Sequence, residues 1–229
     1  MANDPKAVHL GGIDLGQVTD PSALAIVEKV GAGEAAVYTV LELTRFRLGT
    51  SYPDIVTETL GLMVRIPQEH LAPLVVDQTG VGRAVVDMFV EKARGRYICP
   101  VTITNGQRAT QQPDTRDWHV PKKDLVGVVN RLLQTNRLLV APDLQHARLL
   151  NKELSNFRYK ITAAANVVYE AWREGQHDDL VLAVALAVWL GNQGYGDAGT
   201  GAFIEGRREF DIADTLKRFP SPFPGKPWD

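Results

Sequence analysis

One segment constrains the fold more than any other part of this sequence. The run HDDLVLAVALAVW begins with His177, Asp178 and Asp179 and continues as a helix that is apolar on almost every face. A helix of this kind has to be buried, because no side of it suits water. The apolar stretch 180–190 is too short to span a bilayer. The sequence therefore predicts a helix inside a globular core that begins at two adjacent acids.

Two more acids stand where apolar segments end. Asp14 closes the run HLGGID, and Asp77 closes LAPLVVD, each of which has the composition of a buried strand. A carboxylate at the edge of a buried element is costly unless something compensates its charge. Hard cations such as Mg²⁺ prefer oxygen ligands, and two such ions can promote in-line attack on a phosphate. These acids, with Asp178 and Asp179, therefore predict a carboxylate site for divalent metal.

Each acid also has a simpler interpretation. Asp14 suits the cap of a turn, Asp77 suits an ordinary strand-to-helix turn, and one acid before the last helix suits its N-cap. A second adjacent acid needs another reason. Asp179 shares a helical stripe with the small residues Ala183 and Ala187, which would let the helix press against the sheet and bring Asp179 toward Asp14.

Several neighbours of the acids are candidates for auxiliary roles. Gly16 allows a sharp turn after the first strand. Thr79 and Gly80 open a helix whose N-terminus favours anions, so this turn suits a phosphate near a metal. His177 suits a proton shuttle or a metal neighbour, and it suits an exposed flanking residue equally well.

Composition limits the partners. The chain has 229 residues, a formal net charge of -2 and a single cysteine, Cys99. Nucleic acid would have to bind a local basic patch, and a disulfide or thiolate zinc site within the chain is excluded. The candidates for a phosphate-binding face are Lys122, Lys123, Arg148, Lys152 and Arg158, although each alone also fits an ordinary surface charge.

The order of elements predicts a mixed α/β sheet with helices on both faces, formed by residues 1–193. A meander of three antiparallel strands comes first, and parallel strands alternating with helices follow. A Gly- and Pro-rich flexible tail is expected over 194–229. The expected strands are 8–15, 22–30, 35–46, 74–77, 97–104 and 138–140; the helices are 52–66, 81–93, 121–134, 143–154 and one from 178; 105–120 is expected as a loop and 157–174 as a hairpin.

Taken together, these motifs resemble the nuclease domain of a tailed-bacteriophage large terminase, which has a ribonuclease-H-like fold related to the RuvC resolvases. The resemblance covers residues 7–193. It implies metal-binding roles for Asp14, Asp77 and Asp179, with Asp178 as a possible further ligand, and a cofactor of two Mg²⁺ or Mn²⁺ ions. The segments that carry it are GGIDLGQVTDPSALAIVE, LVVDQTGVG, VPKKDLVGVVNRLL, ELSNFRYKIT and YEAWREGQHDDLVLAVALAVW.

The resemblance also implies a function. It predicts an endonuclease that cuts double-stranded DNA during viral genome packaging in the host cytoplasm, without a membrane partner. Low sequence specificity is expected, because nothing in the chain resembles a base-reading helix. A packaging ATPase domain or subunit, a small terminase and a portal are the implied protein partners. The chain has no G-x-x-x-x-G-K-S/T phosphate loop, so an excised domain and a stand-alone nuclease both remain open.

Three other functions fit parts of the pattern. A RuvC-like Holliday junction resolvase would use the same acids, but as a dimer and on branched DNA. An actin-like or sugar-kinase ATPase also carries Asp-x-Gly on its first strand, but it usually needs a second domain of similar size. A non-enzymatic DNA-binding or scaffold module would retain the acids without using them. Cleavage assays with Mn²⁺ and ATP-binding measurements separate these functions.

Overall fold

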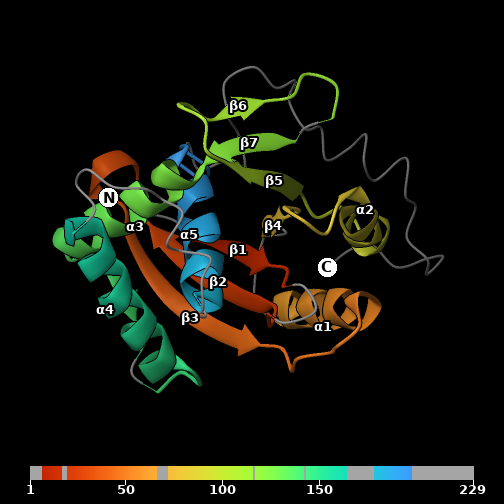
Figure 1. Cartoon of the computed structure of the whole chain (residues 1–229), viewed down its shortest axis with the longest axis horizontal. Helices are drawn as coiled ribbons and strands as arrows, with labels where there is room; N and C mark the ends of the chain where they lie inside the picture. Colours follow the sequence, from red (N-terminus) through yellow and green to blue (C-terminus); the bar gives the residue numbers. More distant parts are fainter. Residues whose placement is uncertain are drawn as a thin grey trace, which may run out of the picture.

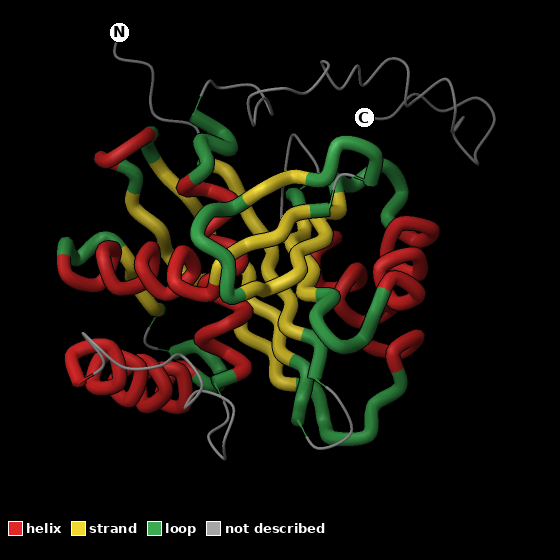
Figure 2. The backbone as a smooth tube through the Cα atoms, turned by 45° about the horizontal axis from the view of Figure 1, so that its top comes forward, coloured by secondary structure: helices red, strands yellow, loops and turns green. Residues whose placement is uncertain are grey.

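The computed structural model describes residues 7–16, 20–65, 72–115, 117–141, 143–163 and 178–197. Within these residues a twisted sheet of eight strands has helices on both faces (Figures 1 and 2). The strands are β1 (Val8–Asp14), β2 (Ala23–Val30), β3 (Val37–Arg45), β4 (Leu74–Asp77), β5 (Ile98–Thr104), β6 (Thr110–Gln111), β7 (Trp118–Pro121) and β8 (Leu138–Val140). The helices are α1 (Tyr52–Val64), α2 (Arg83–Lys92), α3 (Lys122–Gln134), α4 (Ala147–Ala163) and α5 (Asp179–Asn192), with a 3-10 turn η1 (Gly33–Ala35).

The sheet has the strand order β6-β7-β5-β4-β1-β2-β3-β8. The first three strands form an antiparallel meander, and β4, β5 and β7 continue parallel to β1 on its other side. The remaining strands close the edges, since β8 pairs parallel with β3 and β6 pairs antiparallel with β7. This arrangement confirms the predicted mixed α/β sheet with helices on both faces.

The register of the sheet places three charged residues in one row. Asp14 pairs with Ala23 of β2, and Ala23 pairs in turn with Arg45 of β3. On the other side of β1, Ile13 pairs with Val76 of the parallel strand β4, so Asp77 follows at the same level as Asp14. Residues that pair across strands point to the same face. Arg45, Asp14 and Asp77 therefore share one face at one end of the sheet.

That face is the one covered by α5. Residues two positions before the acids, such as Val75 of β4, belong to the core that α3, α4 and α5 form with the sheet. The opposite face carries a second core under α1 and α2. From Asp179 to Gly191, every residue of α5 except Leu182 is buried, which confirms the predicted core helix. Among the described residues, no helix is both long and apolar enough to cross a membrane.

Backbone contact between β1 and α5 depends on one glycine. A Cβ atom at Gly12 would lie 2.1 Å from the carbonyl oxygen of Ala183 and 2.7 Å from the amide nitrogen of Ala187. Only glycine allows an approach this close. The small-residue stripe on α5 therefore does press against the sheet, as the sequence predicts, and it fixes the helix beside β1.

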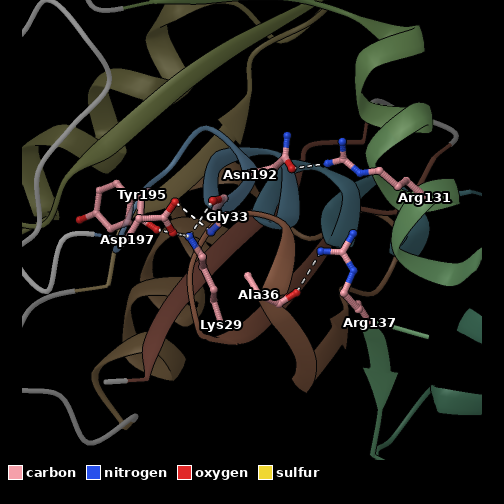
Figure 3. A network of polar contacts seen from close by, with 9 residues as sticks. Lys29, Gly33, Ala36, Arg131, Arg137, Asn192, Tyr195 and Asp197 are labelled. Carbon is pink, nitrogen blue, oxygen red and sulfur yellow. Dashed lines mark hydrogen bonds and ion pairs between the residues drawn. The ribbon is translucent and has the colours of Figure 1, made fainter. Parts of the chain in front are cut away.

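The far end of α5 is held by a buried lysine (Figure 3). Lys29 of β2 donates from Nζ to the carbonyl oxygens of Gly191 and Tyr195, at 2.9 and 2.8 Å, and pairs with the carboxylate of Asp197. That carboxylate also accepts a hydrogen bond from the Gly33 amide at 3.2 Å. Carbonyls at a helix C-terminus lack partners within the helix, so a cation there stabilises the end of α5.

Lys29 thereby anchors residues 194–197, the first residues of the expected tail, as a turn against β2. The rest of that tail, from 198 on, lies outside the described residues. Residues 164–174 of the expected hairpin also lie outside them.

Three expectations about local structure are wrong. The segment 105–120, expected as a loop, contains β6 and the start of β7, because Trp118 and Val120 become buried beside β5. The hairpin expected over 157–174 fails for 157–163, which continue α4. That helix also begins at Ala147 rather than near Asp143, since His146 has a left-handed backbone (φ 68°) that a helix cannot include.

Candidate active site

Three of the predicted acids lie at the same place in the fold. Asp14 and Asp77 end the neighbouring parallel strands β1 and β4, and Asp179 is the first residue of the helix that crosses them. Asp77 and Asp179 are buried. Burial, and after it the charges of Asp77 and Asp179, raises the pKa of the Asp14 carboxyl well above its usual range. The fold therefore gathers three carboxylates whose mutual repulsion, after burial, raises the pKa of Asp14.

The turn after β4 fixes the carboxylate of Asp77. Its Oδ1 accepts a hydrogen bond from the Thr79 amide at 2.8 Å, which is an Asx turn. The Thr79 hydroxyl accepts from the Ile103 amide, also at 2.8 Å, and so joins this turn to β5. Gly80 has a φ of 83°, the left-handed conformation that favours glycine. The structure thus gives Thr79 and Gly80 supporting roles in the turn that presents Asp77.

The turn after β1 requires Gly16. A Cβ there would lie 2.0 Å from the carbonyl oxygen of Asp20. The Gly16 amide donates to the Ser22 hydroxyl at 3.0 Å, and its carbonyl accepts from the Tyr52 hydroxyl at 3.0 Å. An open groove of about 520 Å³ lies between this turn and the start of α1, with Arg47 among its lining residues. Gly16, which follows Asp14 by two positions in the chain, is one of the residues that line this groove.

Arg45 is a site residue that the sequence patterns do not predict. Its Nε and one terminal nitrogen both donate to Oδ2 of Asp179, at 3.1 and 2.8 Å. The two side chains are 22% and 8% exposed, so water screens this ion pair only weakly. No local sequence pattern marks a basic residue at the end of a strand as part of a site. Arg45 becomes part of the site only through the register that puts it in the row of Asp14 and Asp77.

Glu153 of α4 is a second unpredicted residue. Its side chain is buried, and Oε2 accepts a hydrogen bond from the Val181 amide of α5 at 3.2 Å. Burial, together with the nearby charges of Asp179 and Asp178, raises its pKa to about 7. A signal for it is present in the sequence, because Glu153 lies at helical spacing from Leu150 and beside Leu154, within the apolar face of α4.

Asp178 occupies the N-cap position of α5, yet within the described chain its side chain does not cap the helix backbone. The simpler interpretation of this acid as a helix cap therefore fails, and the contribution to the cap comes from Glu153 instead. His177 lies outside the described residues.

The acids have the right chemistry for a hard divalent cation. Their donors are carboxylate oxygens, and a cation would relieve the repulsion that raises the pKa of Asp14. As the side chains stand, however, no three acidic, histidine or cysteine residues of the described chain are arranged to hold a metal ion. In this arrangement Asp179 forms an ion pair with Arg45.

The candidate DNA-binding residues lie on two helices. Lys122 and Lys123 begin α3 and are partly buried, and the Lys123 ammonium donates to the Gln107 side chain at 2.8 Å. Arg148 and Lys152 are exposed on α4. The side chain of Arg158 lies outside the described part of that helix.

Comparison with known proteins supports the resemblance seen in the motifs. The chain is 26% identical over 193 residues to the terminase large subunit of Thermus phage G20c, and 26% identical over 194 residues to that of Thermus virus P23-45. Each alignment covers 83% of this chain and 34% of the relative, so the chain spans about a third of the length of these relatives. No family model matches.

The fold is similar to that of the human cytomegalovirus terminase nuclease domain, in a structure soaked with Mn and bound to an inhibitor. The TM-score is 0.53 at 11% identity, covering 80% of this chain and 82% of the other. At this identity the likeness concerns the fold alone.

Proposed function

Since the chain has the fold of a terminase nuclease domain and is similar in sequence to phage terminase large subunits, we propose that it is a metal-dependent endonuclease that cuts double-stranded DNA during viral genome packaging. The observation that carries this proposal is the meeting of Asp14, Asp77 and Asp179 at the ends of β1, β4 and the start of α5. The Mn-soaked state of the similar viral nuclease domain supports the choice of a divalent metal.

In this proposal two Mg²⁺ or Mn²⁺ ions would be held by the acids: Asp14 would serve both ions, Asp77 one and Asp179 the other, with Asp178 as a further ligand. Bound ions of this kind supply a water of lowered pKa and charge stabilisation for the leaving 3′ oxygen. The chain itself supplies orientation. The Thr79 amide fixes one oxygen of Asp77, and Arg45 holds Oδ2 of Asp179 in place. The products would carry 5′-phosphate and 3′-hydroxyl ends.

The proposed partners follow from the same similarity. Double-stranded DNA is the substrate, and a packaging ATPase domain or subunit, a small terminase and a portal are the protein partners. The host cytoplasm is the proposed site of action.

The proposal is tested by incubating the purified chain with linear duplex DNA and with a four-way junction, each in Mg²⁺, Mn²⁺ or EDTA. Cleavage of linear duplex that needs metal is the expected result. A strong preference for the junction, accompanied by a dimer in solution, would replace the proposal with a RuvC-like resolvase. No cleavage of either substrate in either metal would contradict both functions.

The two adjacent acids should differ in importance. Asp179→Ala should lower the cleavage rate about 100-fold, because Asp179 lies on the stripe of α5 that faces the sheet; the loss for Asp178→Ala should be nearer 10-fold. Cleavage rates and Mn²⁺ affinity of both variants should be measured beside Asn192→Ala, an exposed change at the other end of α5. A larger loss in the Asp178 variant would mean that Asp178, and not Asp179, is the principal ligand.

The start of α3 should contribute to DNA affinity without sequence preference. Replacing Lys122 and Lys123 together by alanine should weaken binding to all duplexes alike and reduce the slope of log affinity against log salt by about 2, since each lysine neutralises one phosphate. Fluorescence titrations should use two unrelated duplexes in Ca²⁺, which prevents cleavage. Lys92→Ala, on α2 across the sheet, is the control. An unchanged slope would move the DNA path toward Arg148 and Lys152.

A further inference from the structure

The first turn of α5 is supported by a carboxylate from a different helix. The Oε2 atom of Glu153 accepts a hydrogen bond from the amide of Val181, the third residue of α5. This amide is one of the first N–H groups of the helix, which have no carbonyl partner within it. Such groups are normally satisfied by the N-cap side chain. Here α4 supplies the acceptor, and a long-range contact replaces a local cap.

The position of Glu153 is costly, so it calls for an explanation. Its residue is 4% exposed and lies next to Leu154 and one turn after Leu150, both part of the core beneath α5. A buried carboxylate is unfavourable unless specific groups bind it. Among the described residues, Oε1 has no hydrogen-bond partner, so the hydrogen bond that this carboxylate makes within the described chain is the one to Val181. A leucine or methionine would fill the same space at lower cost.

The contact matters because of what surrounds it. Gly12 fixes the middle of α5 against β1, and Lys29 fixes its C-terminal end. The N-terminal turn bears the acids Asp178 and Asp179, and its orientation decides where they point. Glu153 holds the backbone of this turn two residues beyond Asp179, while Arg45 holds the Asp179 side chain from the sheet.

We propose that Glu153 is a positioning residue of the nuclease site: its hydrogen bond to Val181 sets the first turn of α5 and thereby places Asp179 and Asp178 toward Asp14. This inference rests on the proposed nuclease function. It assigns to Glu153 an effect through the helix backbone and no contact with metal or DNA. The length of the side chain at position 153 and its ability to accept a hydrogen bond should therefore matter more for cleavage than its charge.

Two substitutions separate reach from charge. Glu153→Gln keeps the length of the side chain and an oxygen acceptor but removes the charge, whereas Glu153→Asp keeps the charge and is one methylene shorter. Glu153→Ala removes both, and Asn151→Ala is an exposed control on the same helix. Cleavage by the Asp and Ala variants should fall about 10- to 100-fold, with a matching rise in the Mn²⁺ concentration needed for half-maximal rate. The Gln variant and the control should cleave like the wild type, and duplex affinity in Ca²⁺ should stay unchanged in all four.

Hydrogen exchange of the Val181 amide provides a readout that does not depend on cleavage. Exchange should accelerate in the Asp and Ala variants and remain slow in the Gln variant. If the Ala variant fails to fold, the Gln and Asp variants still decide the question. An active Asp variant beside an inactive Gln variant would overturn the positioning role, because charge would then be the requirement; wild-type cleavage by the Ala variant would also overturn it. A wild-type chain that cuts no DNA in either metal would instead remove the proposed function itself.

Discussion

Asp14→Asn should abolish metal-dependent cleavage while the chain stays folded, with a loss of rate on the order of 10⁴-fold, as for other essential active-site groups. The change removes the charge of the carboxylate that other acids surround and leaves its volume almost unchanged. Cleavage of linear duplex in Mn²⁺ is the measurement, and far-ultraviolet circular dichroism verifies the fold. Asp20→Asn, at an exposed acid in the neighbouring turn, is the matched control. Cleavage by the Asp14→Asn variant at the wild-type rate would remove Asp14 from the site.

The same variant should be more stable than the wild type when metal is absent. Burial and neighbouring acids raise the pKa of Asp14 in the folded state above its ordinary value near 4. Between the ordinary and the raised pKa the folded state binds more protons than the unfolded state, so the wild-type free energy of unfolding falls as pH rises through this range. The Asp14→Asn variant cannot bind this proton, so its free energy of unfolding should depend less on pH.

The pKa of Glu153 is raised to about 7. The free energy of unfolding of both the wild type and the Asp14→Asn variant should therefore show a smaller fall as pH rises toward that value. Thermal melts from pH 4 to 8 in EDTA test the difference. Mn²⁺ should then raise the melting temperature of the wild type more than that of the variant, because ligands stabilise the state that binds them. A variant that melts below the wild type at pH 8 in EDTA would contradict the inference that burial and neighbouring acids make the charge of Asp14 unfavourable.

Gly12→Ala should disrupt the site through the fold. The added Cβ would lie 2.1 Å from a backbone oxygen of α5, so helix and strand have to separate, and the acids that they carry separate with them. We expect a loss of more than about 3 kcal/mol in the free energy of unfolding, at the upper end for overpacked cores. Cleavage should fall with it.

Gly127→Ala is the matched control for this substitution. Gly127 is an exposed glycine inside α3, and a Cβ added there would meet nothing within 4 Å apart from its chain neighbours and the nearby backbone of its own helix, so alanine should stabilise the helix by up to about 1 kcal/mol. Urea denaturation of both variants gives the comparison. Equal stability of the Gly12 variant and the wild type would mean that α5 does not contact β1 as described.

The sequence by itself determined the elements that a local pattern can encode. The all-apolar helix after Asp178 had to be buried, and the Ala183 and Ala187 stripe indicated close contact with the sheet; the structure shows both. Asp14 and Asp77 were visible because a charged residue at the end of an apolar strand breaks the pattern around it. The meander also followed from local composition, since β-rich segments lie on both sides of a glycine turn.

Only the tertiary structure decided which distant residues join these acids. Arg45 enters the site through strand register, and Glu153 through the packing of α4 on α5. Lys29 of β2 holds the end of α5 from the face of the sheet that the helix covers, a pairing with no trace in local sequence. Strand β7 depends on the neighbours that bury Trp118 and Val120. Local patterns specify what a segment prefers, but a buried charge is placed by its partners, and those partners meet only when the chain is folded.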